Sequence, residues 1–223
     1  METAGQIKVH RYVHDQRRTT EWFWFARSYL EAARCLAREY RMSEQSRSAL
    51  ASPLIFNLRH GLELYLKFLA LGLGESDVRG FNHDIHALFS RVRSSLATLD
   101  EESIGYAAEG LEIDRAEIRK YLEALSWKVE QVTKKYYSYG FLSRGVAAIE
   151  DKKNELFRYP ANTSAGRAFD TSNVHEKLVA AEVADDVESI IRLLWSFFLM
   201  FAKNEGGTHV WKSWGNEVKS ADV

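Results

Sequence analysis

Apolar positions repeat at intervals of three and four along most of the chain, which is the spacing of amphipathic helices. From Thr20 this pattern predicts a first helix that ends near Arg41. The pair Ser52-Pro53, a capping hydroxyl followed by proline, predicts the start of a second helix. Gly72 is expected to end it, because glycine commonly follows the last turn of a helix.

A third helix is expected to begin at a capping Asn82. Its predicted buried face consists of Ile85, Leu88, Phe89, Val92, Leu96 and Leu99. A less regular stretch follows over residues 100–110, and the spacing then predicts a long fourth helix over residues 118–136. Between residues 137 and 172 the helical period fails, and glycines and a proline interrupt the chain.

A final helix is predicted over about residues 173–203. It carries more apolar surface than a single exposed helix would have, so either the bundle wraps it or it forms a dimer interface. No strand pairs are evident. The sequence therefore predicts an all-α fold, a bundle of five to six main helices. Residues 19–203 are expected to form one domain, between a basic, flexible arm (1–18) and a C-terminal tail (204–223).

Composition narrows the class of protein. With 223 residues, of which 46% are hydrophobic and 13% aromatic, the chain can bury a full core. The net charge of −1 argues against a uniformly basic nucleic-acid-binding surface but permits a local basic patch. The lone Cys35 rules out an intrachain disulfide and favours a cytoplasmic protein. There is no secretory signal, and the longest apolar run, Leu193 to Phe201, is far shorter than the ~20 residues that span a bilayer.

The segment from Asn57 to Gly72 carries a polar ridge on an otherwise apolar helix. At ~100° per residue, Arg59, His60, Glu63 and Lys67 fall within one arc of about 100°. The ridge either lines a groove that binds a ligand, or it forms two ion pairs at i,i+4 spacing, from Arg59 to Glu63 and from Glu63 to Lys67.

Three segments, in order, resemble the HEPN superfamily, helical-bundle domains named for nucleotide binding in higher eukaryotes and prokaryotes. Arg59-His60-Gly61-Leu62-Glu63-Leu64-Tyr65-Leu66-Lys67 is similar to the family's small residue, glutamate and Leu-Lys on the second helix. Asn82-His83-Asp84-Ile85-His86-Ala87-Leu88 is similar to the family's His-Asp-Leu at the next helix start. Phe157-Arg158-Tyr159-Pro160 is similar to the Arg-Tyr-Pro that precedes the last helix.

The resemblance implies a HEPN-like bundle, frequent homodimers and a role in RNA cleavage or in binding RNA or nucleotides without a cofactor. Such members often belong to toxin or anti-phage systems, with a cognate antitoxin or partner protein. Residues 101–154 exceed a minimal member and are expected to be an elaboration. The binding residues expected from the ridge and the resemblance are Arg59, His60, Glu63, Lys67, His83, Asp84, Arg158 and Tyr159.

Catalytic members carry an arginine, usually followed by a polar residue, with four to six residues before a histidine. Only Arg79 and His86 fit that spacing, and Gly80 stands where the polar residue is usual. Metal-free RNA cleavage needs a base, an acid and a cation, and histidine and arginine suit these roles. The alternative is that Asn82 and Asp84 cap the helix while His83 packs against the second helix.

A metal site is not expected, because His83, Asp84 and His86 lack the i,i+4 spacing that brings two histidines together on a helix. Two functions from different classes follow. The first is binding of an RNA or nucleotide phosphate, with possible cleavage of RNA. The second is a dimerisation or partner-docking module without chemistry, in which internal acids neutralise the basic side chains.

Overall fold

The computed structural model describes residues 16–73, 75, 78–111, 113–138, 151–154, 157, 174 and 178–201. Within these ranges every regular element is a helix, which confirms the predicted all-α class. The elements are α1 (Gln16–Met42), α2 (Arg47–Gly72), the short 3-10 helix η3 (Arg79–Phe81), α3 (Ile85–Ala97), α4 (Glu101–Leu111), α5 (Arg115–Ser138) and α7 (Ala180–Phe201).

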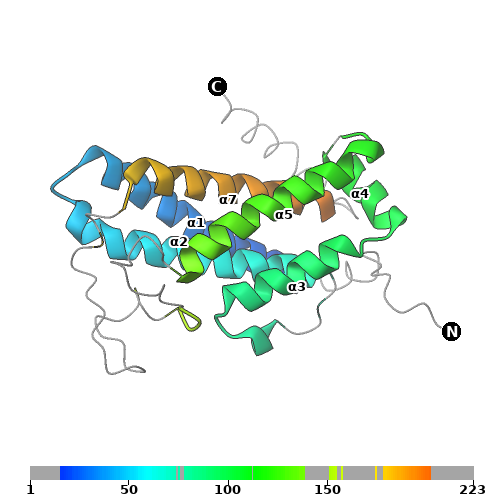
Figure 1. The fold of residues 1–223 in the computed structure, drawn as a ribbon, viewed down its shortest axis with the longest axis horizontal. Coiled ribbons are helices and arrows are strands. Elements are labelled where there is room, and N and C mark those ends of the chain that lie inside the picture. The colour runs from blue at the N-terminus through cyan, green and yellow to red at the C-terminus, as the bar shows by residue number, and fades with distance from the viewer. Residues whose placement is uncertain are drawn as a thin grey trace.

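The helices form a bundle in which α7 lies along one side and α3 along the other (Figure 1). α1 and α2 pack against each other along their lengths, and α7 lies against α1. α3 packs between α2 and α5, while α4 contacts both α5 and α7. In Figure 1, α5 crosses in front of the other long helices on its way from α4. This arrangement places the start of α3 beside the middle of α2.

α2 is the central helix, as its mostly apolar circumference predicts. Nearly all of its side chains from Leu58 to Ala70 are buried. Gly61 is needed for the contact with α1, since a Cβ there would lie 2.8 Å from Leu30 Cγ and 3.2 Å from the Leu30 backbone nitrogen. The small residue therefore permits close packing of the two helices.

The start of α2 differs from the prediction. The helix begins at Arg47, and Pro53 lies inside it instead of at its first position. Proline removes a single backbone donor near the N-terminal end, and the helix continues through it, with Asn57 Nδ2 donating to the Pro53 carbonyl at 2.7 Å. The predicted end at Gly72 is confirmed.

The cap of α3 is Asp84 rather than Asn82. The Asp84 carboxylate accepts hydrogen bonds from the backbone N–H groups of His86 and Ala87 at 3.0 and 2.9 Å. Asn82 instead adopts a positive φ of 49°, a left-handed conformation that asparagine tolerates better than most residues. The buried face predicted for this helix is confirmed, including Leu99 just beyond its end.

Residues 100–110, which the sequence leaves irregular, mostly belong to α4. Asp100 accepts a hydrogen bond from the Ser103 backbone N–H at 2.8 Å, which is an N-terminal cap that the two glycines of this stretch obscure in the sequence. α4 buries Ile104 and Ala108 in the same core as the other helices. Likewise, α5 contributes a buried face that runs from Ile118 to Tyr136. The predicted elaboration at 101–154 therefore includes two helices that help to build the core.

The last described helix, α7, begins at Ala180, later than the sequence predicts, and its apolar surface is covered by α1, α2, α4 and α5. Trp195 and Phe197 are buried, so the bundle wraps this helix.

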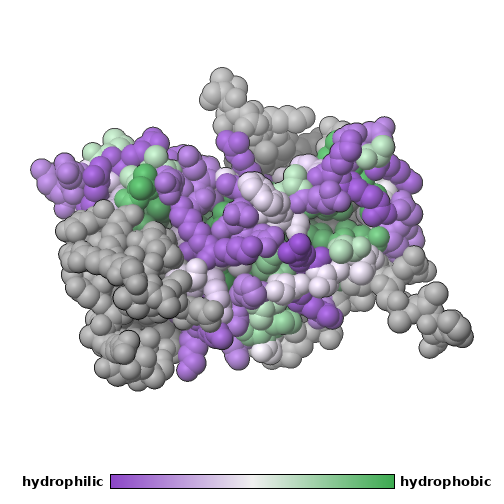
Figure 2. All heavy atoms as spheres, viewed as in Figure 1, coloured by the Kyte–Doolittle hydropathy of each residue, from purple (hydrophilic) through white to green (hydrophobic). Residues whose placement is uncertain are grey.

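α1 begins at Gln16, inside the segment assigned to the arm, and residues 1–15 lie outside the described part. Among the described residues, no helix has the length and apolar character needed to cross a membrane. Figure 2 shows mainly hydrophilic residues on the described surface of one face.

Candidate functional site

The polar ridge of α2 and the turn before α3 meet at one carboxylate, that of Glu63. Lys67 Nζ lies 2.7 Å from Oε1, and His83 Nδ1 lies 3.1 and 3.0 Å from the two oxygens. His60 Nδ1 and Arg59 Nη1 are 3.5 and 3.8 Å from Oε2. We call these five residues the Glu63 centre. The structure thus confirms that the four ridge residues share a face, and it brings the predicted binding residue His83 to the same carboxylate from the turn before α3.

Glu63 is ionised over the whole neutral range. Burial alone would raise the pKa of its carboxyl group, since its side chain is only 1% exposed. Hydrogen bonds from His60, Lys67 and His83 outweigh burial and lower this pKa from 4.5 to about 2. The centre therefore holds a permanent negative charge with basic groups on several sides.

Arg59 ties three separate segments of the chain together. Its fully buried guanidinium donates from Nη2 to the carbonyl oxygens of His83 at 2.7 Å and Asp151 at 3.1 Å. Asp151 is itself fixed to the end of α5, because its N–H donates to the Tyr137 carbonyl at 2.9 Å. Arg59 Nε and Nη1, also buried, have no hydrogen-bond partner in the structure as described.

Aromatic side chains enclose the other two bases. Lys67 Nζ lies 5.4 Å from the centre of the Trp22 ring on α1, a cation–π contact. The His60 ring meets Tyr29 edge to face at 4.4 Å and stacks on Phe56 at 5.7 Å. α1 therefore fixes two of the basic side chains in place.

The ion pairs of the docking interpretation are present in the centre. Arg59 and Lys67 supply two positive charges and Glu63 supplies one negative charge. Asp151, whose carbonyl oxygen accepts from Arg59, is a second buried acid next to the centre.

Solvent reaches the centre through its imidazoles. The His83 side chain is 39% exposed and that of His60 is 21% exposed, whereas Arg59 and Glu63 are buried. Because the ionised Glu63 accepts from His83 Nδ1, that nitrogen carries the proton and Nε2 is left for another partner. His83 is the most accessible polar group of the centre.

The remaining predicted site residues lie elsewhere or outside the described part. Asp84 caps α3, which was the alternative to a binding role for this residue. Arg79 is in η3, and its side chain is not among those described. Arg158 and Tyr159 fall outside the described residues. His86 is exposed, its ring 5.3 Å from that of Tyr137.

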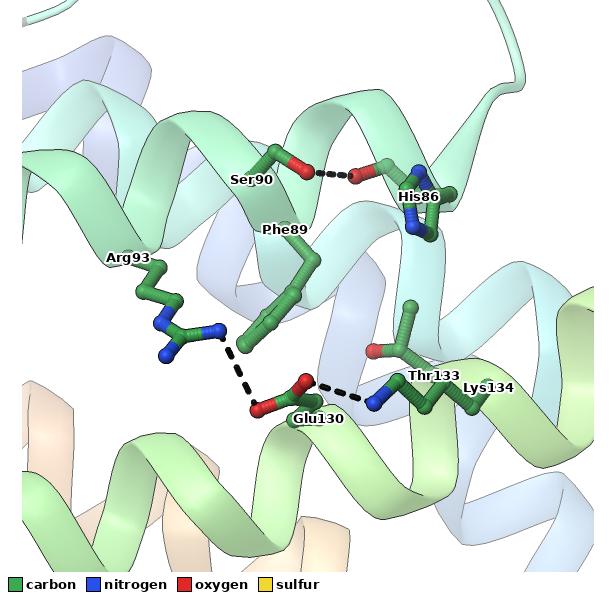
Figure 3. Close-up of a pocket in the computed structure, with 7 residues that line it drawn as sticks. All are labelled: His86, Phe89, Ser90, Arg93, Glu130, Thr133 and Lys134. Carbon is green, nitrogen blue, oxygen red and sulfur yellow. Dashed lines mark hydrogen bonds and ion pairs between the residues drawn. The ribbon is translucent and has the colours of Figure 1, made fainter.

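His86 lines a second site, a pocket of about 260 Å³ between α3 and α5 (Figure 3). We call it the α3–α5 pocket, and its lining residues are His86, Phe89, Ser90, Arg93, Glu130, Thr133 and Lys134. Figure 3 shows Arg93 and Lys134 on either side of Glu130, at 3.4 and 2.7 Å. The hydrogen bond from Lys134 lowers the pKa of Glu130. Sequence analysis missed this pocket, since helical spacing does not reveal that α3 and α5 are neighbours.

Within the described ranges, no group of three or more histidine, cysteine or acidic side chains is placed to hold a metal ion. Comparison with models of known families, with curated proteins and with solved structures finds no match to this chain. The function must therefore be argued from the chemistry of the two sites.

Proposed function

We propose that this chain binds a phosphate group of RNA or of a nucleotide at the Glu63 centre. The observation that carries the proposal is the convergence of four basic side chains on a single carboxylate, two of them imidazoles that reach solvent. A phosphate at His83 and His60 would meet these basic groups, and cations in a low-dielectric setting attract anions more strongly than cations in water do. The resemblance to HEPN domains supports the same class of ligand.

Two further features support an anion at this position. Arg59 keeps two buried N–H-bearing nitrogens without a hydrogen-bond partner among the described residues, so the centre has unused donor capacity. The orientation of His83 leaves Nε2 as the accessible ring atom, and this nitrogen donates to a phosphate oxygen when the imidazole is protonated.

The test is retention of a fluorescently labelled single-stranded RNA, measured by anisotropy across a salt series. Wild-type protein should bind at low salt and lose affinity as salt rises, because phosphate contacts release counterions. His83→Gln keeps a donor for Glu63 but loses the second ring nitrogen that faces solvent, and it should weaken binding about fivefold. Lys120→Met, which removes an exposed lysine paired with Glu117 on α5, is the control and should bind like wild type.

Absence of RNA or nucleotide binding at low salt would reject the proposal, as would equal affinities for wild type and His83→Gln. Either result would favour the alternative that the chain is a dimerisation or partner-docking module. Phe25 on α1 and Trp127 on α5, which are 61% and 62% exposed, offer contact surfaces for such a partner. Light scattering on the same samples would then report whether the chain self-associates.

Cleavage of RNA is a separate proposal with its own test. Arg79 and His86 belong to η3 and α3 respectively, on either side of the Asn82 turn. If they act as cation and acid or base, Arg79→Ala and His86→Ala should each abolish cleavage of total RNA in the presence of a chelator, with unchanged circular dichroism. Equal cleavage by both variants and wild type would rule out this pair.

A further inference from the structure

The α3–α5 pocket has more hydrogen-bond donors than acceptors. Each oxygen of Glu130 takes a single cation, Lys134 at 2.7 Å and Arg93 at 3.4 Å. A guanidinium has five N–H donors and an ammonium three, so both cations keep donors that no other described acceptor uses. His86, exposed at the pocket, adds an imidazole. A ligand that offers several hydrogen-bond acceptors and a negative charge, such as an oxyanion, would match this lining.

A buried hydroxyl gives an independent indication that the pocket is built for a ligand. Thr133 Oγ1 is fully buried and has no hydrogen-bond partner in the part of the chain that is described. Helical serines of this protein, such as Ser90, Ser94 and Ser138, satisfy their hydroxyls by donating to the carbonyl four residues earlier. The Thr133 hydroxyl makes no such hydrogen bond among the described residues. Thr133 stands on the pocket wall that α5 forms, opposite α3 (Figure 3).

Apolar and ring surfaces complete the pocket. The Phe89 ring lies between the α3 and α5 polar groups (Figure 3). The His86 ring lies 5.3 Å from the ring of Tyr137. A volume of about 260 Å³ is below the ~300 Å³ at which pockets for drug-sized ligands begin, so the occupant is small. An oxyanion joined to one compact, ring-sized group matches this lining.

We propose that the α3–α5 pocket binds a small phosphomonoester, with its phosphate at Arg93, Lys134 and the Thr133 hydroxyl and its organic group against Phe89 and His86. The donors favour phosphate over carboxylate, because a phosphomonoester offers three terminal acceptor oxygens and a carboxylate two. Arg93 and Lys134 also exceed Glu130 by one positive charge. This site is separate from the Glu63 centre and does not depend on the function proposed there.

The test uses phenyl phosphate as the probe and benzoate as its carboxylate counterpart. Isothermal titration of the full chain at fixed ionic strength should show saturable binding of phenyl phosphate, at least fivefold tighter than benzoate. Lys134→Met and Arg93→Met should each weaken it about fivefold, the effect of one lost exposed charge contact. Thr133→Val, which keeps the shape and removes the hydroxyl, should weaken it also.

Glu130 provides the sharpest variant, because its effect has the opposite sign. In the free protein its carboxylate occupies the two cations and repels the ligand, so Glu130→Gln should tighten binding of phenyl phosphate. The matched controls are Lys120→Met and Glu117→Gln, an exposed ion pair on the same helix, and both should leave affinity unchanged. His83→Gln should also have no effect, which separates this site from the Glu63 centre.

Several results would overturn the proposal. These are the absence of saturable binding by the wild type, equal affinity for benzoate, equal effects of Lys134→Met and Lys120→Met, or a Glu130→Gln variant that does not bind more tightly. Circular dichroism of each variant would establish that the helices are intact. A folded Thr133→Val variant with wild-type affinity would exclude the hydroxyl from the site.

Discussion

At the scale of single residues, the carboxylate of Glu63 couples folding to pH. Its pKa falls from 4.5 to about 2 on folding, so the folded state holds its proton less tightly than the unfolded state does. The resulting stabilisation is complete above the unfolded pKa, and it is lost as pH falls through the folded value. Acid should therefore weaken the centre between about pH 4.5 and 2.

We expect Glu63→Gln to remove this acid dependence. The difference in unfolding free energy between wild type and Glu63→Gln should shrink by about 3 kcal/mol between pH 5 and pH 2, given ~1.4 kcal/mol per pKa unit. Urea denaturation at several pH values measures it. Glu117→Gln, which breaks an exposed ion pair with Lys120 on α5, is the control and should show little pH dependence. A constant difference across this range would contradict the pKa of Glu63.

The sequence predicted the five residues of this centre but not the contacts between them. Helical spacing places Arg59, His60, Glu63 and Lys67 on one face, because the period of an α-helix is fixed. It does not determine that His83 returns to Glu63 from another element, or that Trp22 covers Lys67, since both contacts depend on how helices pack.

At the scale of elements, the close contact between α1 and α2 depends on a glycine. Gly61→Ala would place a Cβ 2.8 Å from Leu30 Cγ and force the helices apart. Overpacking of this kind costs about 1–3 kcal/mol, against a gain of ~1 kcal/mol in helix propensity. We expect a net loss of stability, seen as a lower melting temperature.

Gly80 offers a matched control, since a Cβ there would meet nothing within 4 Å. Gly80→Ala should change stability by less than about 0.5 kcal/mol, as is usual for exposed positions without special contacts. If the two variants melted at the same temperature, the close packing at Leu30 would not be stabilising.

The errors in the predicted elements have local causes. The sequence favours Ser52-Pro53 as a helix start, but an extra turn forms ahead of it because proline near the N-terminal end removes only one hydrogen bond. α4 is missed since glycines weaken its pattern, while the Asp100 cap and burial of Ile104 stabilise it. Strong and long periods, as in α5, are predicted well.

At the scale of the whole molecule, the sequence predicts the class of fold but not which helices are neighbours. The spacing of apolar residues in α5 would be the same whether α5 packed against α3 or against another helix. Only the structure shows that the two are neighbours and that a pocket lies between them. The sequence likewise does not decide whether the apolar surface of α7 is buried in the bundle or forms a dimer interface. The contacts of α7 with α1, α2, α4 and α5 bury Ile190, Leu194 and Phe197 among its described apolar side chains.

The hydrogen bond from Arg59 to the Asp151 carbonyl joins residues 92 positions apart in the chain. During synthesis on the ribosome, Arg59 emerges long before its acceptor exists. Closing so long a loop is slow compared with forming α1 and α2, whose contacts are local. The guanidinium of the nascent protein therefore lacks this acceptor until the chain beyond α5 has left the exit tunnel, although every residue of the Glu63 centre has been made by then.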